Sequence, residues 1–516
     1  MTADRLNARN VLRNTVLFGF AGVLLIAANI MMALEGDYDE NAVCTLFAAN
    51  ICLNLGIVFD LCKNIRRDFP MLVFTGTYDL LLLGRVYCTF LGDYNNLLED
   101  LEAESYSNLF QAMQIVTLAL LFTYLAYKLS APLFRRKETA IRQKGAASVH
   151  GGPLVPIIRQ ISVVLLLVSS LAFFFTLLQT ILNVLRNGYL TSFTQQSDAN
   201  VPTVIRRLSM FFTPSFAIFL ATMPSKRQMK LPLFVYGVYM LASLFTGRRN
   251  TFVCEALMIV IYFVMRDSLL PKEQRVLKKK TVFWAIVACV VMMYLLELVA
   301  VIRAGSAAKR GGFFYSLAQF VNSQGASFRV VMQTVNYWDR FNHHNSYLYL
   351  FYPFEQFVHN NLLLRTIFGF NPIAEVQNIQ FVTGTHNYAH VLTYLVDPAR
   401  YLSGGGFGTS FVAEAYVAYG MGGVAVISAL FGVIFRFFSS LLTRPWPVIT
   451  FGLIAVKSLV YVPRNFALSW IMDVFSVTYL CCILGVYLLA QLVVWIGSNV
   501  REARTADADP APEGKP

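Results

Sequence analysis

Apolar residues in this chain are gathered into blocks of about 20, which short polar segments separate. A helix of about 20 residues crosses the hydrocarbon core of a bilayer, which is about 30 Å thick. Inside lipid every backbone N–H and C=O group must be bonded within the protein, so only helices and closed barrels span membranes. Blocks of this length are typical of helices. The sequence therefore predicts an all-α integral membrane protein.

The composition agrees with many such spans. Hydrophobic residues make up 56% of the chain and charged residues 14%, whereas a soluble domain has about 25% charged residues. We therefore predict one polytopic unit with about twelve transmembrane helices. The predicted spans are residues 15–34, 43–62, 70–91, 108–128, 160–182, 207–223, 231–245, 251–266, 281–302, 409–435, 446–462 and 472–496.

Basic and acidic residues alternate from one predicted loop to the next. Arg5, Arg9 and Arg13 precede the first span, whereas Glu35 and Asp37 follow it. Cytoplasmic loops of membrane proteins are enriched in lysine and arginine. We therefore predict that both termini face the cytoplasm. A basic cytoplasmic face then explains the net charge of +13, and we expect no nucleic-acid partner.

One long segment between spans falls on the extracytoplasmic side in this topology. It mixes apolar, aromatic and polar residues, which is typical of short amphipathic helices at a membrane surface. We therefore divide the chain into helices one to nine (1–302), this extracytoplasmic substrate loop (303–408), helices ten to twelve (409–500) and a disordered cytoplasmic tail (501–516).

A glycine-rich run at the end of this loop begins the candidate site. Glycines before an apolar helix let the backbone approach a ligand and leave N–H groups that can bind it; a hinge or a helix-entry turn is the alternative. Glu414 follows one turn into the helix, where a carboxylate is costly to bury and suggests a functional role. The candidate residues of this stretch are Gly404, Gly405, Gly406, Gly408, Ser410, Glu414 and Tyr416.

Several arginines fall on the predicted external side, where positive residues are normally scarce. A guanidinium group binds phosphate with paired hydrogen bonds and keeps its charge when buried. We expect these arginines to bind the diphosphate of a lipid whose tail lies in the bilayer. The alternative for each is pairing with an acid such as Glu297 or Asp473. The arginines are Arg248, Arg249, Arg303, Arg310, Arg329, Arg400 and Arg464.

The external segment is also rich in aromatic and histidine residues. Tyrosines such as Tyr388 are able to stack on sugar rings, although an interfacial aromatic belt is the alternative. His386 is a candidate proton acceptor or hydrogen-bond donor. His386 and His390 have the spacing of a helical metal pair, but no HExxH or cysteine motif accompanies them, so we predict no metal site.

The run from Tyr401 to Gly423 reads YLSGGGFGTSFVAEAYVAYGMGG. It resembles the glycine–serine–acid–tyrosine–glycine signature of Wzy-type O-antigen and exopolysaccharide repeat-unit polymerases. The Gly247-Arg248-Arg249 turn before a membrane helix and the Pro463-Arg464 pair resemble further features of that family. About twelve spans with one large external loop match as well. O-antigen ligases and other transferases of lipid-linked sugars share this architecture.

The resemblance implies a GT-C-like glycosyltransferase in the bacterial cytoplasmic membrane, with its active site on the extracytoplasmic side. Such an enzyme transfers a growing glycan from undecaprenyl diphosphate to the non-reducing end of a lipid-linked repeat unit, in the biosynthesis of O-antigen, capsule or exopolysaccharide. We expect no cofactor, although a divalent cation that arrives with the diphosphate is compatible with such a site. A chain-length regulator is the expected protein partner.

Catalytic roles follow from this implied chemistry. Arginines would stabilise the charge that develops on the leaving diphosphate, and Arg248 and Arg464 are the catalytic candidates for this role. The acceptor hydroxyl needs a general base, for which Glu414 is the first choice and His386 the second. Two alternatives remain: a ligase that uses the same donor with another acceptor, and a flippase or transporter of the lipid-linked oligosaccharide.

Overall fold

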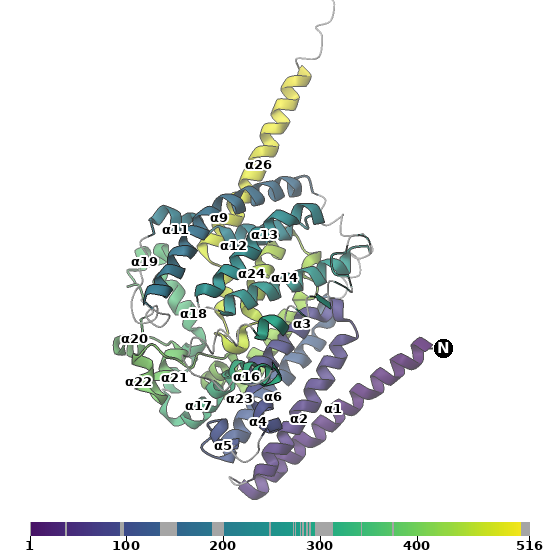
Figure 1. The fold of residues 1–516 in the computed structure, drawn as a ribbon, viewed down its shortest axis with the longest axis vertical. Helices are drawn as coiled ribbons and strands as arrows, with labels where there is room; N and C mark the ends of the chain where they lie inside the picture. Colours follow the sequence, from purple (N-terminus) through teal and green to yellow (C-terminus); the bar gives the residue numbers. More distant parts are fainter. Residues whose placement is uncertain are drawn as a thin grey trace, which may run out of the picture.

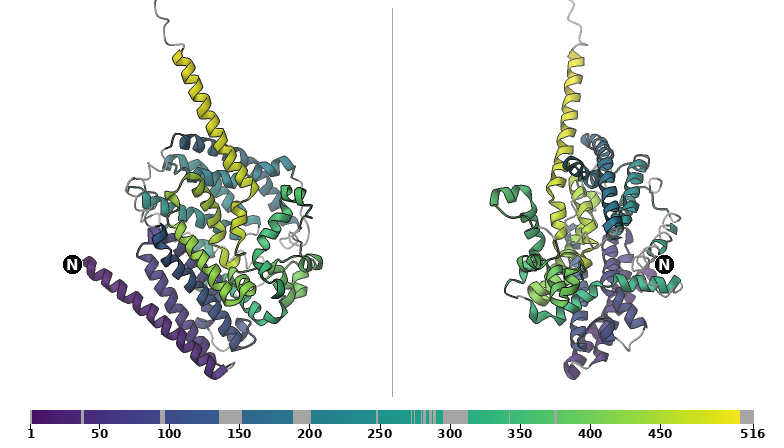
Figure 2. Two further views of the ribbon diagram at one scale, coloured as in Figure 1. Left: turned by 180° about the vertical axis from the view of Figure 1, so that it is seen from behind. Right: turned by 60° about the vertical axis from the view of Figure 1, so that its left-hand side comes forward.

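The protein is a bundle of long helices with a group of short helices against one side (Figures 1 and 2). The computed structural model describes residues 2–36, 39–92, 97–134, 152–187, 201–246, 249–271, 273, 275–278, 280, 283–284, 287, 290–294, 313–341, 343–373 and 376–506. Every regular element in these residues is a helix. The all-α class predicted from the apolar blocks is confirmed.

Nine helical segments within the described residues are long and apolar enough to cross a membrane, and each coincides with a predicted span. The chain is therefore a multi-pass membrane protein. The segments are α1 (Thr2–Glu35), α2 (Glu40–Cys62), α3–η2–α4 (Ile65–Tyr78, Asp79–Leu83 and Gly84–Gly92), α6 (Tyr106–Leu129), α9 (Leu154–Asn187), α11–α12 (Thr203–Ser209 and Phe212–Ala221), α13–η4 (Lys226–Ser243 and Leu244–Thr246), α23 (Phe411–Phe438) and α25–α26 (Ser469–Val474 and Val477–Ala506).

Three further predicted spans are not among these nine. The helix α14 (Arg249–Leu269) covers the predicted span 251–266 but carries charged residues in both of its halves. The helix α24 (Trp446–Leu459) has 14 residues, which reach about 21 Å at 1.5 Å per residue, against a core of about 30 Å. The predicted span 281–302 lies mostly outside the described residues. The number twelve stays a prediction.

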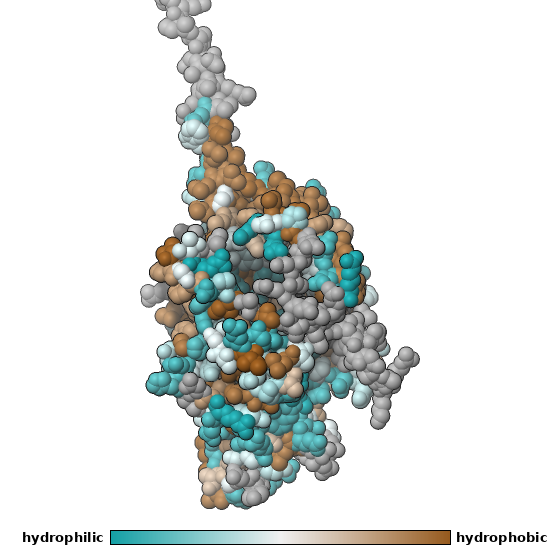
Figure 3. All heavy atoms as spheres, turned by 90° about the vertical axis from the view of Figure 1, so that its left-hand side faces the viewer, coloured by the Kyte–Doolittle hydropathy of each residue, from teal (hydrophilic) through white to brown (hydrophobic). Residues whose placement is uncertain are grey.

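The outer helices of the bundle present apolar side chains to their surroundings. On α1, exposed Leu12, Val16, Phe20 and Val23 recur every three or four residues along one face. Figure 3 shows the same character along the part of α26 that leaves the bundle. Surfaces of this kind are stable in lipid. The helix α26 continues through Ala506, past the residue at which the disordered tail is predicted to begin.

The core of the bundle is organised around α23, which packs along α6. At Gly432 the two backbones come so close that a Cβ atom would overlap the carbonyl oxygen of Thr123. Small residues allow such close packing where lipid supplies no hydrophobic driving force between helices. The axis formed by α23 and α6 therefore fixes the position of every element that packs on it.

Seven short helices follow in the segment that is predicted to lie outside the membrane. They pack against one another and against α4, α6 and α23, and most of them lie at the lower left in Figure 1. They are α16 (Phe313–Gln324), α17 (Ser327–Asn336), α18 (Tyr347–Asn360), α19 (Leu362–Phe368), α20 (Ile379–Gly384), α21 (Tyr388–Val396) and α22 (Pro398–Leu402).

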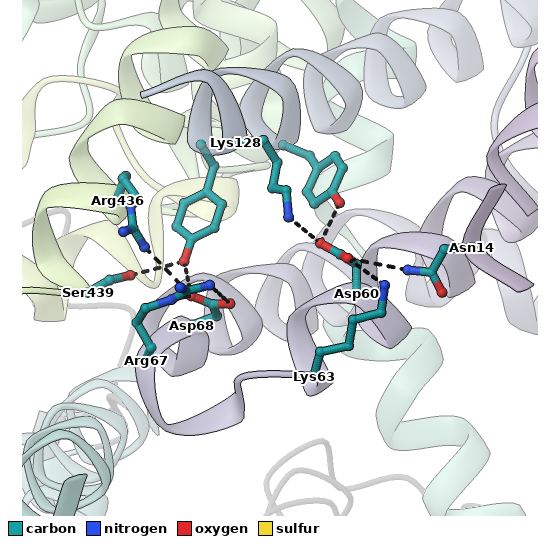
Figure 4. A network of polar contacts seen from close by, with 10 residues as sticks. Asn14, Asp60, Lys63, Arg67, Asp68, Lys128, Arg436 and Ser439 are labelled. Carbon is teal, nitrogen blue, oxygen red and sulfur yellow. Dashed lines mark hydrogen bonds and ion pairs between the residues drawn. The ribbon is translucent and has the colours of Figure 1, made fainter. Parts of the chain in front are cut away.

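Two aspartates join the helix ends on the side that is predicted to face the cytoplasm (Figure 4). Asp60 at the end of α2 lies 3.1 Å from Lys63 and 2.6 Å from Lys128 of α6. Asp68 in α3 receives two hydrogen bonds from Arg67, at 2.6 and 2.9 Å. The hydroxyl of Tyr127 in α6 also donates to Asp68 Oδ1 at 2.7 Å. The two aspartates therefore connect both α2 and α3 to α6 at one end of the bundle.

Candidate active site

A cavity of about 210 Å³ lies where α14, α24 and the short turn η9 (Val462–Arg464) meet. Asn250 and Thr251, from the first turn of α14, form one side of it. Tyr461 and Asn465, on either side of η9, form another. The first turn of α14, which begins at Arg249, and the residues that flank η9, which carries Arg464, therefore border the same cavity. They lie far apart in the sequence. We call it the smaller cavity.

A buried ion pair lies in the wall of the smaller cavity. Lys457 Nζ of α24 is 3.1 Å from Glu255 Oε1 of α14, and the hydroxyl of Tyr236 donates to Glu255 Oε2 at 2.7 Å. A buried charge is tolerated when it is paired and hydrogen-bonded. Because Lys457 and Glu255 compensate each other, a ligand anion in this cavity would need a further positive charge, such as that of Arg464 in η9.

A larger cavity, of about 790 Å³, adjoins the smaller one between α9, α11, α12, α18 and the segment α25–α26. Figure 3 faces this side of the molecule and shows a hollow near its centre, bordered by hydrophilic side chains. The volume is that of a pocket for a sizeable small-molecule ligand. Its polar lining includes the hydroxyl, amide and guanidinium side chains of Thr213, Thr478, Gln356, Asn360, Asn361 and Arg207.

The two cavities share part of their lining. Asp473 of α25 and Tyr479 of α26 border both of them. The hydroxyl of Ser458, which lies at the end of α24 in the wall of the smaller cavity, donates a hydrogen bond to Asp473 Oδ2. A carboxylate therefore stands where the two spaces meet.

Some of the predicted arginines lie outside the described residues, one lies beside the smaller cavity, and two lie around the ring of Phe407. Arg248, Arg303 and Arg310 lie outside the described residues, and the structure describes only the backbone of Arg249. Arg464 belongs to η9 and is partly buried beside the smaller cavity. The remaining two predicted arginines, in α17 and α22, lie elsewhere.

These two arginines gather around the ring of Phe407 in the glycine-rich run. The guanidinium groups of Arg329 and Arg400 lie 4.2 and 4.8 Å from the ring centroid. Arg329 Nε is also 2.5 Å from Glu102 Oε2, and Arg85 approaches the same carboxylate at 3.6 Å. This cluster contains more guanidinium groups than carboxylates at short range, but it borders neither cavity.

The glycine-rich run forms a tight turn that packs against this arginine cluster. Gly404 and Gly408 have φ of 88° and 83°, a conformation that glycine adopts at no steric cost. A Cβ atom on Gly405 would approach the Arg400 side chain to 2.8 Å. Gln377 donates to the carbonyl oxygen of Gly405 at 3.1 Å. Gly406 belongs to the same turn, and the run therefore leads the chain tightly into α23.

Glu414, the first candidate base, is completely buried in the first turn of α23. Its Oε1 accepts a hydrogen bond from the Thr409 hydroxyl, and its Oε2 accepts one from the backbone N–H of Ala467 at 3.0 Å. These bonds connect the start of α23 with the segment after η9. In this structure both carboxylate oxygens are occupied by donors from the protein itself.

His386, the second candidate base, forms a pair with a residue that sequence patterns did not single out. Its Nδ1 lies 3.1 Å from Glu355 Oε2 of α18, and the histidine side chain is 35% exposed. A carboxylate at Nδ1 orients an imidazole ring. Neither His386 nor Glu414 lines either cavity.

The remaining predicted residues are packed into the protein. Tyr388 is fully buried, bonds to Thr334 and stacks on the ring of Phe341; burial raises the pKa of its hydroxyl. Ser410 is also fully buried. Tyr416 accepts a hydrogen bond from Gln111 at 2.6 Å and is nearly buried. Tyr388 therefore joins the short helices α17 and α21, and Tyr416 joins α23 to α6.

Three functional candidates emerge only from the structure. Lys457 carried a signal in the sequence, because a cation inside an apolar stretch suggests a functional group. Glu355 and Arg207 carried none, since an acid in a mixed helix and a cation beside a span are ordinary. Their place follows from packing between segments that are distant in sequence.

Comparison with known proteins agrees with the resemblance seen in the sequence. The family model described as O-antigen polysaccharide polymerase Wzy matches residues 16–494. No curated protein and no solved structure matches the chain. The matched region contains all nine membrane-spanning segments, in full or in large part, as well as both cavities. The chain belongs to the O-antigen polysaccharide polymerase Wzy family.

Proposed function

We propose that this chain is a glycosyltransferase that joins lipid-linked repeat units into a polysaccharide at the outer face of the bacterial cytoplasmic membrane. The donor is a growing glycan on undecaprenyl diphosphate, and the acceptor is the non-reducing end of a second lipid-linked unit. One observation carries the proposal: the first turn of α14, which begins at Arg249, and the residues that flank η9, which carries Arg464, border one cavity, and this cavity adjoins a larger one with hydroxyl and amide groups.

The smaller cavity is the proposed site of the diphosphate. The α14 helix begins at Arg249, and Asn250 and Thr251 of its first turn line this cavity. Free N–H groups and the helix dipole favour an anion at such a place. Arg248, Arg249 and Arg464 add guanidinium groups that match phosphate oxygens. The helix N-terminus and the guanidinium groups would therefore both favour binding of the diphosphate here.

The larger cavity is the proposed site of the sugars. Sugar hydroxyls need hydrogen-bond partners, which Gln356, Asn360 and Thr213 offer, and the apolar faces of sugar rings pack on aromatic side chains such as Phe357. The wall formed by α18 comes from the segment that is predicted to be extracytoplasmic. This supports a site that opens toward the outer side of the membrane.

The proposed transfer displaces the lipid diphosphate from the donor sugar. The acceptor oxygen attacks the anomeric carbon, its proton passes to a base, and the bond to the diphosphate breaks with its electron pair on the departing oxygen. Arg248 and Arg464 stabilise the charge that develops there, which requires no nucleotide. We propose the Arg329–Arg400 cluster and the glycine-rich turn as a further binding surface for the glycan or its lipid carrier.

Reconstitution tests the proposal. Purified protein in lipid vesicles receives a repeat unit linked to a lipid diphosphate, without a chain-length regulator or any other protein. We expect a ladder of products that increase by one repeat unit. Substrate that binds but yields no ladder would overturn the polymerase assignment. Transfer to another acceptor would then indicate a ligase, and movement of the lipid across the vesicle membrane would indicate a flippase.

A matched pair of arginine variants locates the site within the same assay. Arg464→Lys keeps the charge but loses the paired hydrogen bonds, so we expect it to slow polymerisation about 10- to 100-fold. Arg340→Lys is the control, because Arg340 is exposed, stacks on Tyr337 and borders neither cavity. Equal rates for the two variants would remove Arg464 from the diphosphate site.

A further inference from the structure

We propose that Asp473 is the general base that takes the proton from the acceptor hydroxyl. The inference rests on the proposed function, and it concerns a residue that was expected from the sequence only as a counter-ion for an arginine. Asp473 lies in α25 and borders both the smaller and the larger cavity. If the diphosphate occupies the first space and sugars occupy the second, the bond that is exchanged lies at their junction. Asp473 stands at that junction.

The other candidate bases lack this position. Glu414 has no exposed surface, and both of its oxygens accept hydrogen bonds from Thr409 and Ala467. His386 is accessible but is oriented by Glu355 on a part of α18 that does not line a cavity. Glu255 does line the smaller cavity, but it is held by Lys457 and Tyr236. Among the described acidic side chains, Asp473 alone lines both cavities.

The surroundings of Asp473 orient the carboxylate and leave it accessible. Asp473 is exposed, while the short helix that carries it is held between α24 and α18. The Ser458 hydroxyl donates to Oδ2. Within the described part of the chain no hydrogen bond reaches Oδ1. One oxygen is therefore fixed by the protein, and the other is available to a substrate hydroxyl.

The step balances without a further reactant. The acceptor O–H bond breaks as its proton moves to Asp473 Oδ1, and the new bond forms between the acceptor oxygen and the anomeric carbon. The carbon–oxygen bond to the diphosphate breaks, and its electron pair leaves on the diphosphate. Cations beside the smaller cavity, Arg464 among them, stabilise that charge. The proton on Asp473 returns to solvent or to the released diphosphate before the next cycle.

The experiment compares three variants in the reconstituted ladder assay, with kcat and KM measured separately. Asp473→Asn keeps the size and loses the base, so we expect kcat to fall at least about 100-fold while KM changes little. Asp473→Glu keeps the base and should recover part of the rate. Asp339→Asn is the matched control, because Asp339 is exposed and lines neither cavity; we expect it to behave as wild type.

The outcomes separate this inference from the proposed function. A wild-type ladder with a near-normal kcat for Asp473→Asn overturns Asp473 as the base and leaves the polymerase intact; a large loss in His386→Gln or Glu414→Gln would then identify the base. A raised KM with unchanged kcat also overturns it. If Asp473→Asn does not fold, Ser458→Ala takes its place, with an expected fall in kcat of about 10-fold because the carboxylate is no longer oriented. An unchanged kcat in Ser458→Ala would then count against the inference.

Discussion

At the scale of single residues, burial sets the protonation state of His390 in α21. Burial lowers the pKa of this imidazole to about 4, and its Nδ1 lies 3.2 Å from the hydroxyl of Tyr401. In the unfolded chain the pKa is about 6.5. Between these two values the unfolded chain binds more protons, so folding stability is fully present above pH 6.5 and falls as the pH drops toward 4.

We therefore expect unfolding in detergent to shift to lower temperature over this pH range. The contribution of His390 is at most about 3 kcal/mol. His390→Gln has no ionisable group and should flatten the pH dependence relative to wild type. Parallel curves for the two proteins would show that His390 does not account for acid sensitivity, and that its pKa is close to that of the unfolded chain.

The residues of the site were predictable to different degrees. An arginine in a short external loop stands out against the usual charge distribution, so the sequence singles out Arg248, Arg249 and Arg464 as candidates, and their role stays a prediction. The start of α14 and the residues that flank η9 meet at one cavity only through tertiary packing. Glu414 was also a candidate, because an acid inside an apolar helix is costly to bury. The sequence does not reveal that Thr409 and Ala467 donate hydrogen bonds to its two oxygens.

At the scale of elements, the contact between α23 and α6 depends on the absence of a side chain at Gly432. We expect Gly432→Ala to destabilise the protein by about 1 to 3 kcal/mol, since the added methyl group would press on the Thr123 carbonyl of α6. Gly422→Ala, on the same helix, meets nothing within 4 Å and should be neutral or stabilising by up to about 1 kcal/mol. Thermal unfolding of both variants in one detergent is the measurement. Equal effects in the two variants would mean that the close contact with Thr123 does not determine the cost at Gly432.

Hydropathy located the elements well where length and composition agree. The nine apolar segments of the structure coincide with predicted spans, because a window of about 20 apolar residues is a strong signal. The signal is weaker for α24, whose apolar stretch from Trp446 continues past the end of the helix at Leu459 into the turn η9. Hydropathy alone does not show that the helix ends at Leu459. The short helices α16–α22 were expected as a class, but their bounds depend on mutual packing.

At the scale of the whole molecule, two sets of charged groups lie apart from each other. One set joins the ends of α2, α3, α6 and α23 around Asp60 and Asp68 (Figure 4). The other surrounds the cavities between α14, α24 and α25. The first set pairs its charges within the protein, whereas the second includes Asp473, which is accessible. We infer that the first set maintains the bundle and the second performs the chemistry.

This division predicts that changes in the set around Asp60 and Asp68 alter the stability of the protein but not its activity. Asp68 contacts Arg67, Tyr127 and buried Arg436, so Asp68→Asn should destabilise the protein by about 3 kcal/mol through weaker compensation of the buried guanidinium. Asp60→Asn is the matched change beside the more accessible Lys63 and Lys128, and it should cost about 1 kcal/mol or less. The polymerisation rate per folded molecule should equal that of wild type in both variants, as measured by the ladder assay normalised to folded protein. A lower rate for Asp68→Asn at unchanged stability would show that the bundle end and the cavities are coupled, and the division would then be wrong.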